Sequence, residues 1–187
     1  MAQKRKDWNG LISGFKASDL VFLDESGCNT DMTRRYAYSL GGSRAIDSAP
    51  LSKPKNTTIL SSIQLDGTLR YTTFSGGTTV ERFKRYLETD LLPHLNGNSV
   101  LIMDNMKSHH AKAVRNLLDS SSVRYIYLPP YSPDLNPIEK LWSKVKAFLR
   151  KFKARMLDAL PNAIQNAFHA VTVSDCSGWF RFCRYAL

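Results

Sequence analysis

Apolar and polar positions follow two different patterns along the chain, and together they predict the order of its elements. Short apolar runs and stretches of β-branched residues, bounded by turn formers, predict strands. The strands are expected at residues 20–23, 57–65, 69–74, 100–103 and 123–128. Capping residues and prolines predict where helices begin and end. The helices are expected from residue 78 or 79 to about 92, from 108 to 119 and from 136 to about 155, with two weaker helices after them.

This order predicts the class of fold. A meander of three strands followed by alternating helices and strands implies a mixed sheet with helices on its faces. The layout resembles the ribonuclease-H-like fold, so we expect an α/β domain with a mixed five-stranded sheet flanked by helices. Apolar and polar residues alternate over residues 34–40 well enough to predict a further strand, after the one at residues 20–23.

Length and charge narrow the class of protein. The chain has 187 residues, 26 Lys and Arg against 16 Asp and Glu, and a net charge of +10. We expect residues 1–17 to be a loose lead and residues 18–187 to form one domain. No apolar run is long enough for a membrane span or a secretory signal, and three scattered cysteines fit a reducing compartment. The positive charge predicts a polyanionic partner, although charge alone does not separate nucleic acid from an anionic membrane.

Three carboxylates are the candidate chemistry. Asp24 and Asp104 each end an apolar strand, and Glu139 lies in the first turn of the helix after the last strand. If the two strands are neighbours, their carboxylates converge and need a cation to offset their repulsion. Carboxylates suit Mg²⁺ or Mn²⁺, and two such ions about 4 Å apart can hold the reacting oxygens of a phosphodiester. Each residue has an alternative: Asp is common in turns, and Glu139 would fit a capping box begun by Asn136.

The residues around these carboxylates resemble a known family. Residues 23–27, 103–109 and 129–139 together resemble the mariner superfamily of DDE transposases, and most closely its bacterial insertion-sequence branch. The 34 residues between Asp104 and Glu139 are the spacing of that branch. The resemblance implies that Asp24, Asp104 and Glu139 hold two Mg²⁺ (or Mn²⁺) ions. It further implies cleavage at transposon ends by water and transfer of the freed 3′-OH into target DNA, usually at TA.

Two further groups of residues are predicted to support this chemistry. Asn105 and His109 match the family pattern after Asp104 and are expected to orient a metal ligand or contact the scissile phosphate. The helix that starts near Asn136 carries seven basic residues up to Arg155. We expect part of this set to contact the DNA backbone. The residues chosen are Lys140, Lys144, Lys146, Arg150 and Lys153. A solvated amphipathic helix and a membrane-surface helix are the alternatives.

The resemblance also sets expectations about partners and about competing functions. The expected partners are double-stranded DNA, a second copy in a homodimer, and a helix-turn-helix polypeptide that is separate or fused by frameshifting, because the lead is too short to contain one. The expected location is the nucleoid in the cytoplasm of a bacterium, with no membrane association. Two functions compete with transposition: a non-catalytic remnant that binds DNA or regulates full-length transposase, and an RNA–DNA hybrid nuclease.

Overall fold

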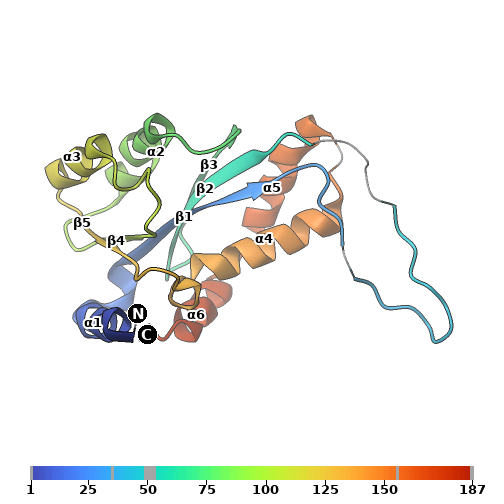
Figure 1. Ribbon diagram of the computed structural model, residues 1–187, viewed down its shortest axis with the longest axis horizontal. Helices are drawn as coiled ribbons and strands as arrows, with labels where there is room; N and C mark the ends of the chain where they lie inside the picture. Colours follow the sequence, from blue (N-terminus) through green and yellow to red (C-terminus); the bar gives the residue numbers. More distant parts are fainter. Residues whose placement is uncertain (1, 35, 49–53, 155, 186–187) are drawn as a thin grey trace.

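The computed structural model of the chain describes residues 2–34, 36–48, 54–154 and 156–185, and within them five strands form a single mixed sheet (Figure 1). The strands are β1 (Leu20–Cys28), β2 (Thr57–Gln64), β3 (Leu69–Ser75), β4 (Val100–Met103) and β5 (Arg124–Tyr127). They lie in the order β3-β2-β1-β4-β5, antiparallel from β1 to β3 and parallel from β1 through β4 to β5. The prediction of an α/β fold with a mixed five-stranded sheet is confirmed.

Helices cover both faces of this sheet. In the described part of the chain they are α1 (Ala2–Ile12), α2 (Val80–Tyr86), α3 (Lys112–Ser120), α4 (Ile138–Phe152), α5 (Leu160–His169) and α6 (Val173–Phe182). Successive side chains of a strand point to opposite faces. Phe22 of β1 therefore packs in a core with α1, α4, α5 and α6, whereas Leu23 packs in a second core with α2 and α3.

Short turns extend several of these helices. A π-helical turn (Leu87–Leu91) and a 3₁₀ turn (Leu92–His94) continue α2. Further 3₁₀ turns lie at Ala17–Asp19, Pro133–Leu135 and Leu157–Ala159.

The strand expected at residues 34–40 is wrong for the residues that are described there. Residues 34 and 36–40 form no strand, and Arg35 lies outside the described residues. Tyr36 and Tyr38 are 91% and 106% exposed. The preceding strand, β1, has no edge open to this segment, because it pairs with β2 on one edge and with β4 on the other. This segment instead extends away from the sheet (Figure 1).

The N-terminal residues, expected to be a loose lead, contain helix α1. Trp8 is only 4% exposed and belongs to the core that packs on Phe22. A buried tryptophan ties the helix to the domain, because its large apolar surface would otherwise face water. The domain boundary at residue 18 stays a prediction.

The starts of two helices differ from the sequence-based expectation. Helix α3 begins at Lys112 and not at Ser108, because residues 107–110 form turns that bury His109. Helix α4 begins at Ile138 with Pro137 as its N-cap residue, so the prediction that Asn136 caps it is wrong. Arg155, the expected end of α4, lies outside the described residues. No helix in the described part of the chain is long and apolar enough to cross a membrane.

Candidate active site

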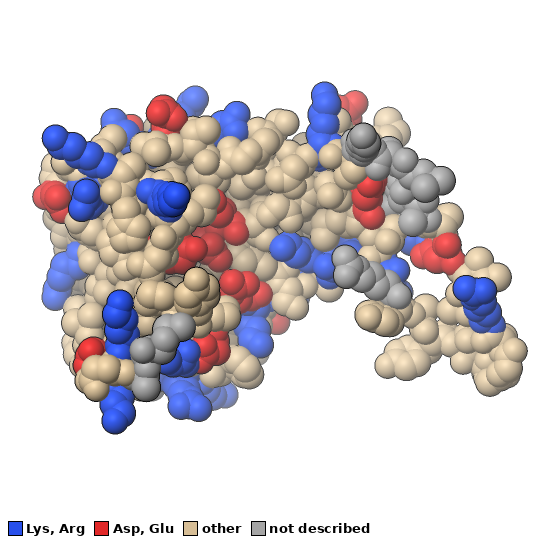
Figure 2. All heavy atoms as spheres, viewed as in Figure 1, with Lys and Arg blue, Asp and Glu red and all other residues tan. Residues whose placement is uncertain are grey.

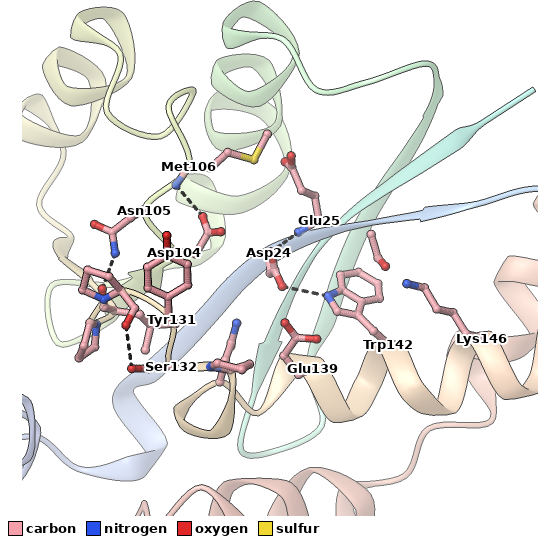
Figure 3. A pocket seen from close by; sticks show the side chains of 16 residues that line it. Asp24, Glu25, Asp104, Asn105, Met106, Tyr131, Ser132, Glu139, Trp142 and Lys146 are labelled. Carbon is pink, nitrogen blue, oxygen red and sulfur yellow. Dashed lines mark hydrogen bonds between the residues drawn. The ribbon is translucent and has the colours of Figure 1, made fainter. Parts of the chain in front are cut away.

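The parallel pairing of β1 with β4 brings two of the predicted carboxylates together. Leu23 lies opposite Met103 in this pairing, so Asp24 and Asp104 follow at the same edge of the sheet. Strand β1 does not end at Asp24, as its apolar run suggested, but continues to Cys28 along β2. Asp24 and Asp104 line one cavity of about 690 Å³ together with Glu139 (Figure 3).

Asp24 is the most buried of the three carboxylates, at 8% exposed. Its Oδ1 accepts a hydrogen bond from the backbone N–H of Glu25 at 2.7 Å, and its Oδ2 accepts one from Nε1 of Trp142 at 3.1 Å. Burial raises the pKa of Asp24 to about 7, against these two hydrogen bonds, and the charges of Asp104 and Glu139 act in the same direction as burial. A nearby cation would favour the ionised form of this group.

Asp104 is held by the turn that follows it. Its Oδ1 accepts a hydrogen bond from the backbone N–H of Met106 at 3.0 Å and lies 2.8 Å from Nδ1 of His109. Burial acts to raise the pKa of Asp104, but the hydrogen bond and charge of His109 and the N–H of Met106 outweigh it, so the pKa is lowered. The His109 ring is fully buried and stacks on Phe83 with ring centroids 4.2 Å apart.

Glu139 is the second residue of α4, and its side chain faces the cavity from the side opposite Asp104 (Figure 3). In the described residues no side chain caps the first turn of α4, so Glu139 is not part of the capping box that Asn136 would have started. The Glu139 side chain is exposed and is therefore available to bind a ligand in the cavity.

The donor chemistry of the cavity fits a divalent cation. Carboxylate oxygens are the ligands that Mg²⁺ and Mn²⁺ prefer. One further oxygen of a cavity-lining residue, Oδ1 of Asn136, is buried without a hydrogen-bond partner among the described residues. Oε2 of Glu25 lies 3.9 Å from Nε2 of His109. The carboxylates share the cavity, but no three His, Cys, Asp or Glu side chains in the described part of the chain are grouped closely enough to hold one ion.

The two predicted supporting residues have different contacts. His109 contacts Asp104 directly, and its expected role in orienting a metal ligand stays a prediction. Asn105 lines the cavity, but its side-chain amide donates to the carbonyl oxygen of Leu128. Asn105 therefore holds the loop after β5, and its expected role beside the metal or the scissile phosphate stays a prediction. Trp142 was not among the site residues expected from the sequence, and its hydrogen bond to Asp24 was missed.

The loop between β5 and α4 is fixed from several sides. Tyr185 donates a hydrogen bond from its hydroxyl to the carbonyl oxygen of Leu135. Arg5 of α1 pairs with Asp134 and donates to Ser132 Oγ at 3.2 Å. The loop therefore meets both the N-terminal helix and the C-terminal end of the described chain immediately before it leads into α4.

The five basic residues expected to contact DNA fall into two groups. Lys146 lines the cavity, and Arg150 lines a groove on the same helix, which Lys144 lines as well. The other three contact the rest of the protein: the Nζ of Lys140 lies over the Phe182 ring, Lys144 pairs with Asp175, and Lys153 pairs with Asp47. Figure 2 shows acidic side chains gathered near the middle of this face, with basic side chains beside them over α4. The DNA-binding role of the five residues stays a prediction.

Similarities to known proteins agree with this architecture. Residues 19–160 match the family described as DDE superfamily endonuclease. Over 97 residues the chain is 31% identical to the Tc1 transposase of Caenorhabditis elegans, a match that covers 50% of this chain and 36% of that protein. The pre-cleavage Mos1 transpososome superposes with a TM-score of 0.82 at 19% identity, over 99% of this chain and 60% of that chain. The catalytic domain of Mos1 mariner transposase superposes with a TM-score of 0.68 at 17% identity, over 98% and 88% of the two chains.

These similarities confirm the coarser parts of the sequence-based prediction. The fold is that of the Mos1 catalytic domain, so the expectation of a ribonuclease-H-like fold is confirmed. The chain spans well under two thirds of the length of the Tc1 transposase that it matches. Since the family match extends over most of the chain and includes Asp24, Asp104 and Glu139, the chain belongs to the DDE superfamily of endonucleases.

Proposed function

We propose that the chain is the catalytic domain of a transposase of the bacterial insertion-sequence type. It cleaves DNA at the ends of a mobile element and joins the freed 3′ ends to target DNA at TA. The observation that carries the proposal is the convergence of Asp24 and Asp104, at the end of the β1–β4 pairing, on a cavity that also contains Glu139. A solvent-accessible cavity lined by three carboxylates matches what metal-dependent phosphodiester chemistry requires.

The residues proposed to hold two Mg²⁺ or Mn²⁺ ions are Asp24, Asp104 and Glu139. When bound, the ions supply Lewis acidity to the attacking and leaving oxygens of a phosphodiester. His109 keeps the Asp104 carboxylate directed, since their contact is 2.8 Å and the histidine ring is buried. Asn105 holds the carbonyl of Leu128 and so keeps the loop before α4 in place.

Lys146 and Arg150 are proposed to bind phosphates of the DNA backbone beside this cavity. Lys146 lines the cavity. It follows Trp142 by four residues, slightly more than one helical turn, and so lies on the same side of α4. A cation beside three carboxylates reduces the repulsion that an incoming phosphate would meet. The TA target would come from the low cost of deforming a pyrimidine–purine step, because phosphate contacts carry no sequence information.

Similar proteins support the choice of substrate, metal and assembly. Mos1 transposase has been seen in a paired-end complex with a transposon end, in a strand transfer complex, and in paired-end complexes with Mn and with Mg. By analogy with these complexes, the proposal includes double-stranded DNA as the substrate. It also includes a homodimer in the active complex and a helix-turn-helix unit as a partner.

The test is nicking of a supercoiled plasmid with Mg²⁺ or Mn²⁺ by the wild-type chain and by its Asp104→Asn variant. We expect nicked circles from the wild type alone. The variant changes one oxygen to nitrogen and so preserves the side-chain volume, and circular dichroism checks its fold. Equal nicking by both proteins contradicts the assignment of Asp104.

Two further results would favour the competing functions. A folded wild-type chain that binds DNA without nicking it supports the non-catalytic remnant. Faster cleavage of an RNA–DNA hybrid than of duplex DNA supports the hybrid nuclease. The same assay on Asp24→Asn and Glu139→Gln tests the remaining two carboxylates.

A further inference from the structure

A buried tryptophan joins the helix that carries Glu139 to the strand that carries Asp24. The indole N–H of Trp142 donates to Oδ2 of Asp24 at 3.1 Å, and the Trp142 side chain is 3% exposed (Figure 3). The hydrogen bond lies between α4 and β1, two elements that are far apart in the sequence. The hydrogen bond therefore directly links the two elements that carry the proposed metal ligands Glu139 and Asp24.

The indole ring is held in this orientation by its neighbours. Phe168 of α5 meets Trp142 edge to face, with centroids 6.5 Å apart and an interplanar angle of 73°. Phe168 is in turn stacked on Tyr71 of β3 at 4.0 Å. Because packed aromatic rings in a core do not turn freely, the N–H stays directed at Asp24.

Helix geometry makes the same hydrogen bond act on Glu139. Residues three apart on a helix lie on the same face, and both Glu139 and Trp142 line the cavity. A bond from Trp142 to β1 therefore fixes the first turns of α4 against the strand. The separation of the Asp24 and Glu139 carboxylates then depends on this contact.

The chemistry of the donor suits a cation site. An indole N–H is a neutral donor, so it orients the Asp24 carboxylate without adding the positive charge that a lysine would bring. Each carboxylate oxygen has two lone pairs, and in Asp24 each oxygen accepts one described hydrogen bond. Each oxygen thus keeps acceptor capacity that a metal ion can use.

We propose that Trp142 is a positioning residue of the divalent-cation site, which sets the orientation of Asp24 and its distance from Glu139. The inference rests on the proposed function, since it assumes that these carboxylates bind a metal. Under this proposal Trp142 affects the affinity of the site for a metal ion, whereas a residue that only packs in the core would not.

The test compares Mn²⁺ binding by the wild type, Trp142→Phe and Trp8→Phe, measured by the decrease of the free Mn²⁺ signal in electron paramagnetic resonance. Trp8 is the matched control, because it is buried to a similar degree in the same core but does not line the cavity. We expect Trp142→Phe to weaken Mn²⁺ binding roughly tenfold, the lower end of what removal of such a partner costs. We expect Trp8→Phe to bind Mn²⁺ as the wild type does.

Equal Mn²⁺ affinity in Trp142→Phe and the wild type overturns the inference and leaves the metal site intact. A wild-type chain that binds no Mn²⁺ overturns the metal site of the proposed function, and the inference with it. Equal weakening in both phenylalanine variants also overturns it, since the effect then belongs to core packing in general.

A second measurement needs no substitution at Trp142. The chain has three tryptophans, and their indole N–H signals can be assigned in ¹H–¹⁵N spectra with Trp8→Phe and Trp179→Phe. Saturating Mg²⁺ is expected to shift the indole signal of Trp142 and to leave that of Trp8 unchanged. A Trp142 signal that does not move at saturation overturns the inference even if Trp142→Phe fails to fold.

Discussion

The Oδ1 of Asp104 lies 2.8 Å from the Nδ1 of His109, and the intervening residues make the turns between β4 and α3. His109 has no exposed side-chain surface and stacks on Phe83. A ring buried in this way has few alternative rotamers, so it holds the carboxylate at the end of β4 in one direction. This contact therefore restricts the side chain of Asp104, a loop residue, to one orientation in the cavity.

Replacing His109 by Phe is therefore expected to lower DNA cleavage at least tenfold, because the ring still fits against Phe83 but no longer contacts Asp104. His109→Asn, whose amide nitrogen can take the place of Nδ1, is expected to retain more activity than His109→Phe. The measurement is the initial rate of plasmid nicking, with His110→Asn as the control at the neighbouring position. A wild-type rate of nicking in His109→Phe would contradict a role of His109 in orienting Asp104.

DNA binding is expected to depend more on Lys146 and Arg150 than on the basic residues with partners inside the protein. Replacing both by Ala should flatten the dependence of log affinity on log salt by about one unit for each phosphate that no longer meets a basic side chain. The matched control, Lys144→Ala with Lys153→Ala, removes the same charge from residues that pair with Asp175 and Asp47. Equal slopes in the two double variants would mean that α4 acts through its net charge alone.

Asp175 is expected to stabilise the domain in a pH-dependent way. Its carboxylate accepts hydrogen bonds from Lys144 and from the backbone N–H of Thr172, which completes a capping box at the start of α6. The hydrogen bond from Lys144 contributes most to lowering the pKa of Asp175 below its ordinary value of 3.8. A lowered pKa means that the stabilisation is complete above the unfolded-state pKa and is lost as pH falls through the folded-state value.

The free energy of unfolding should therefore be lower in Asp175→Asn than in the wild type by about 1 kcal/mol at pH 7. The difference should begin to shrink as pH falls below about 4, where the unfolded-state carboxylate starts to bind protons, and should be lost once the pH is below the lowered folded-state pKa. Urea denaturation at several pH values measures it. A difference that stays constant down to about pH 2, below the ordinary range of an aspartate pKa, would contradict an electrostatic origin.

Much of the sheet could be predicted because its central strands are buried on both faces. Residues 20–23 and 100–103 are continuous apolar runs, which identify them as strands without any knowledge of their neighbours. Once the two strands are placed side by side and parallel, the convergence of Asp24 and Asp104 follows. The strand expected at residues 34–40 failed because alternation is a local signal, whereas a strand also needs a neighbouring strand to pair with, and the preceding strand β1 is paired on both edges.

The part of the site that escaped prediction depends on contacts between distant segments. Trp142 belongs to an apolar stripe of α4, and nothing in that stripe indicates where its N–H points. Its partner, Asp24, lies 118 positions away in the chain. The internal partners of Lys144 and Lys153 are equally remote, so the periodicity of the helix indicated the position of these charges and not their contacts.

The burial of Trp8 predicts that the N-terminal helix contributes to the stability of the domain. Trp8→Ala removes a large side chain from the main core, and such truncations cost about 3 to 5 kcal/mol. Lys6→Ala, on an exposed position of the same helix, is the control and should change the free energy of unfolding by less than about 0.5 kcal/mol. Chemical denaturation followed by circular dichroism measures both variants. A destabilisation below about 1 kcal/mol in Trp8→Ala would mean that residues 2–12 behave as a loose lead after all, since a truncation inside a packed core cannot be that mild.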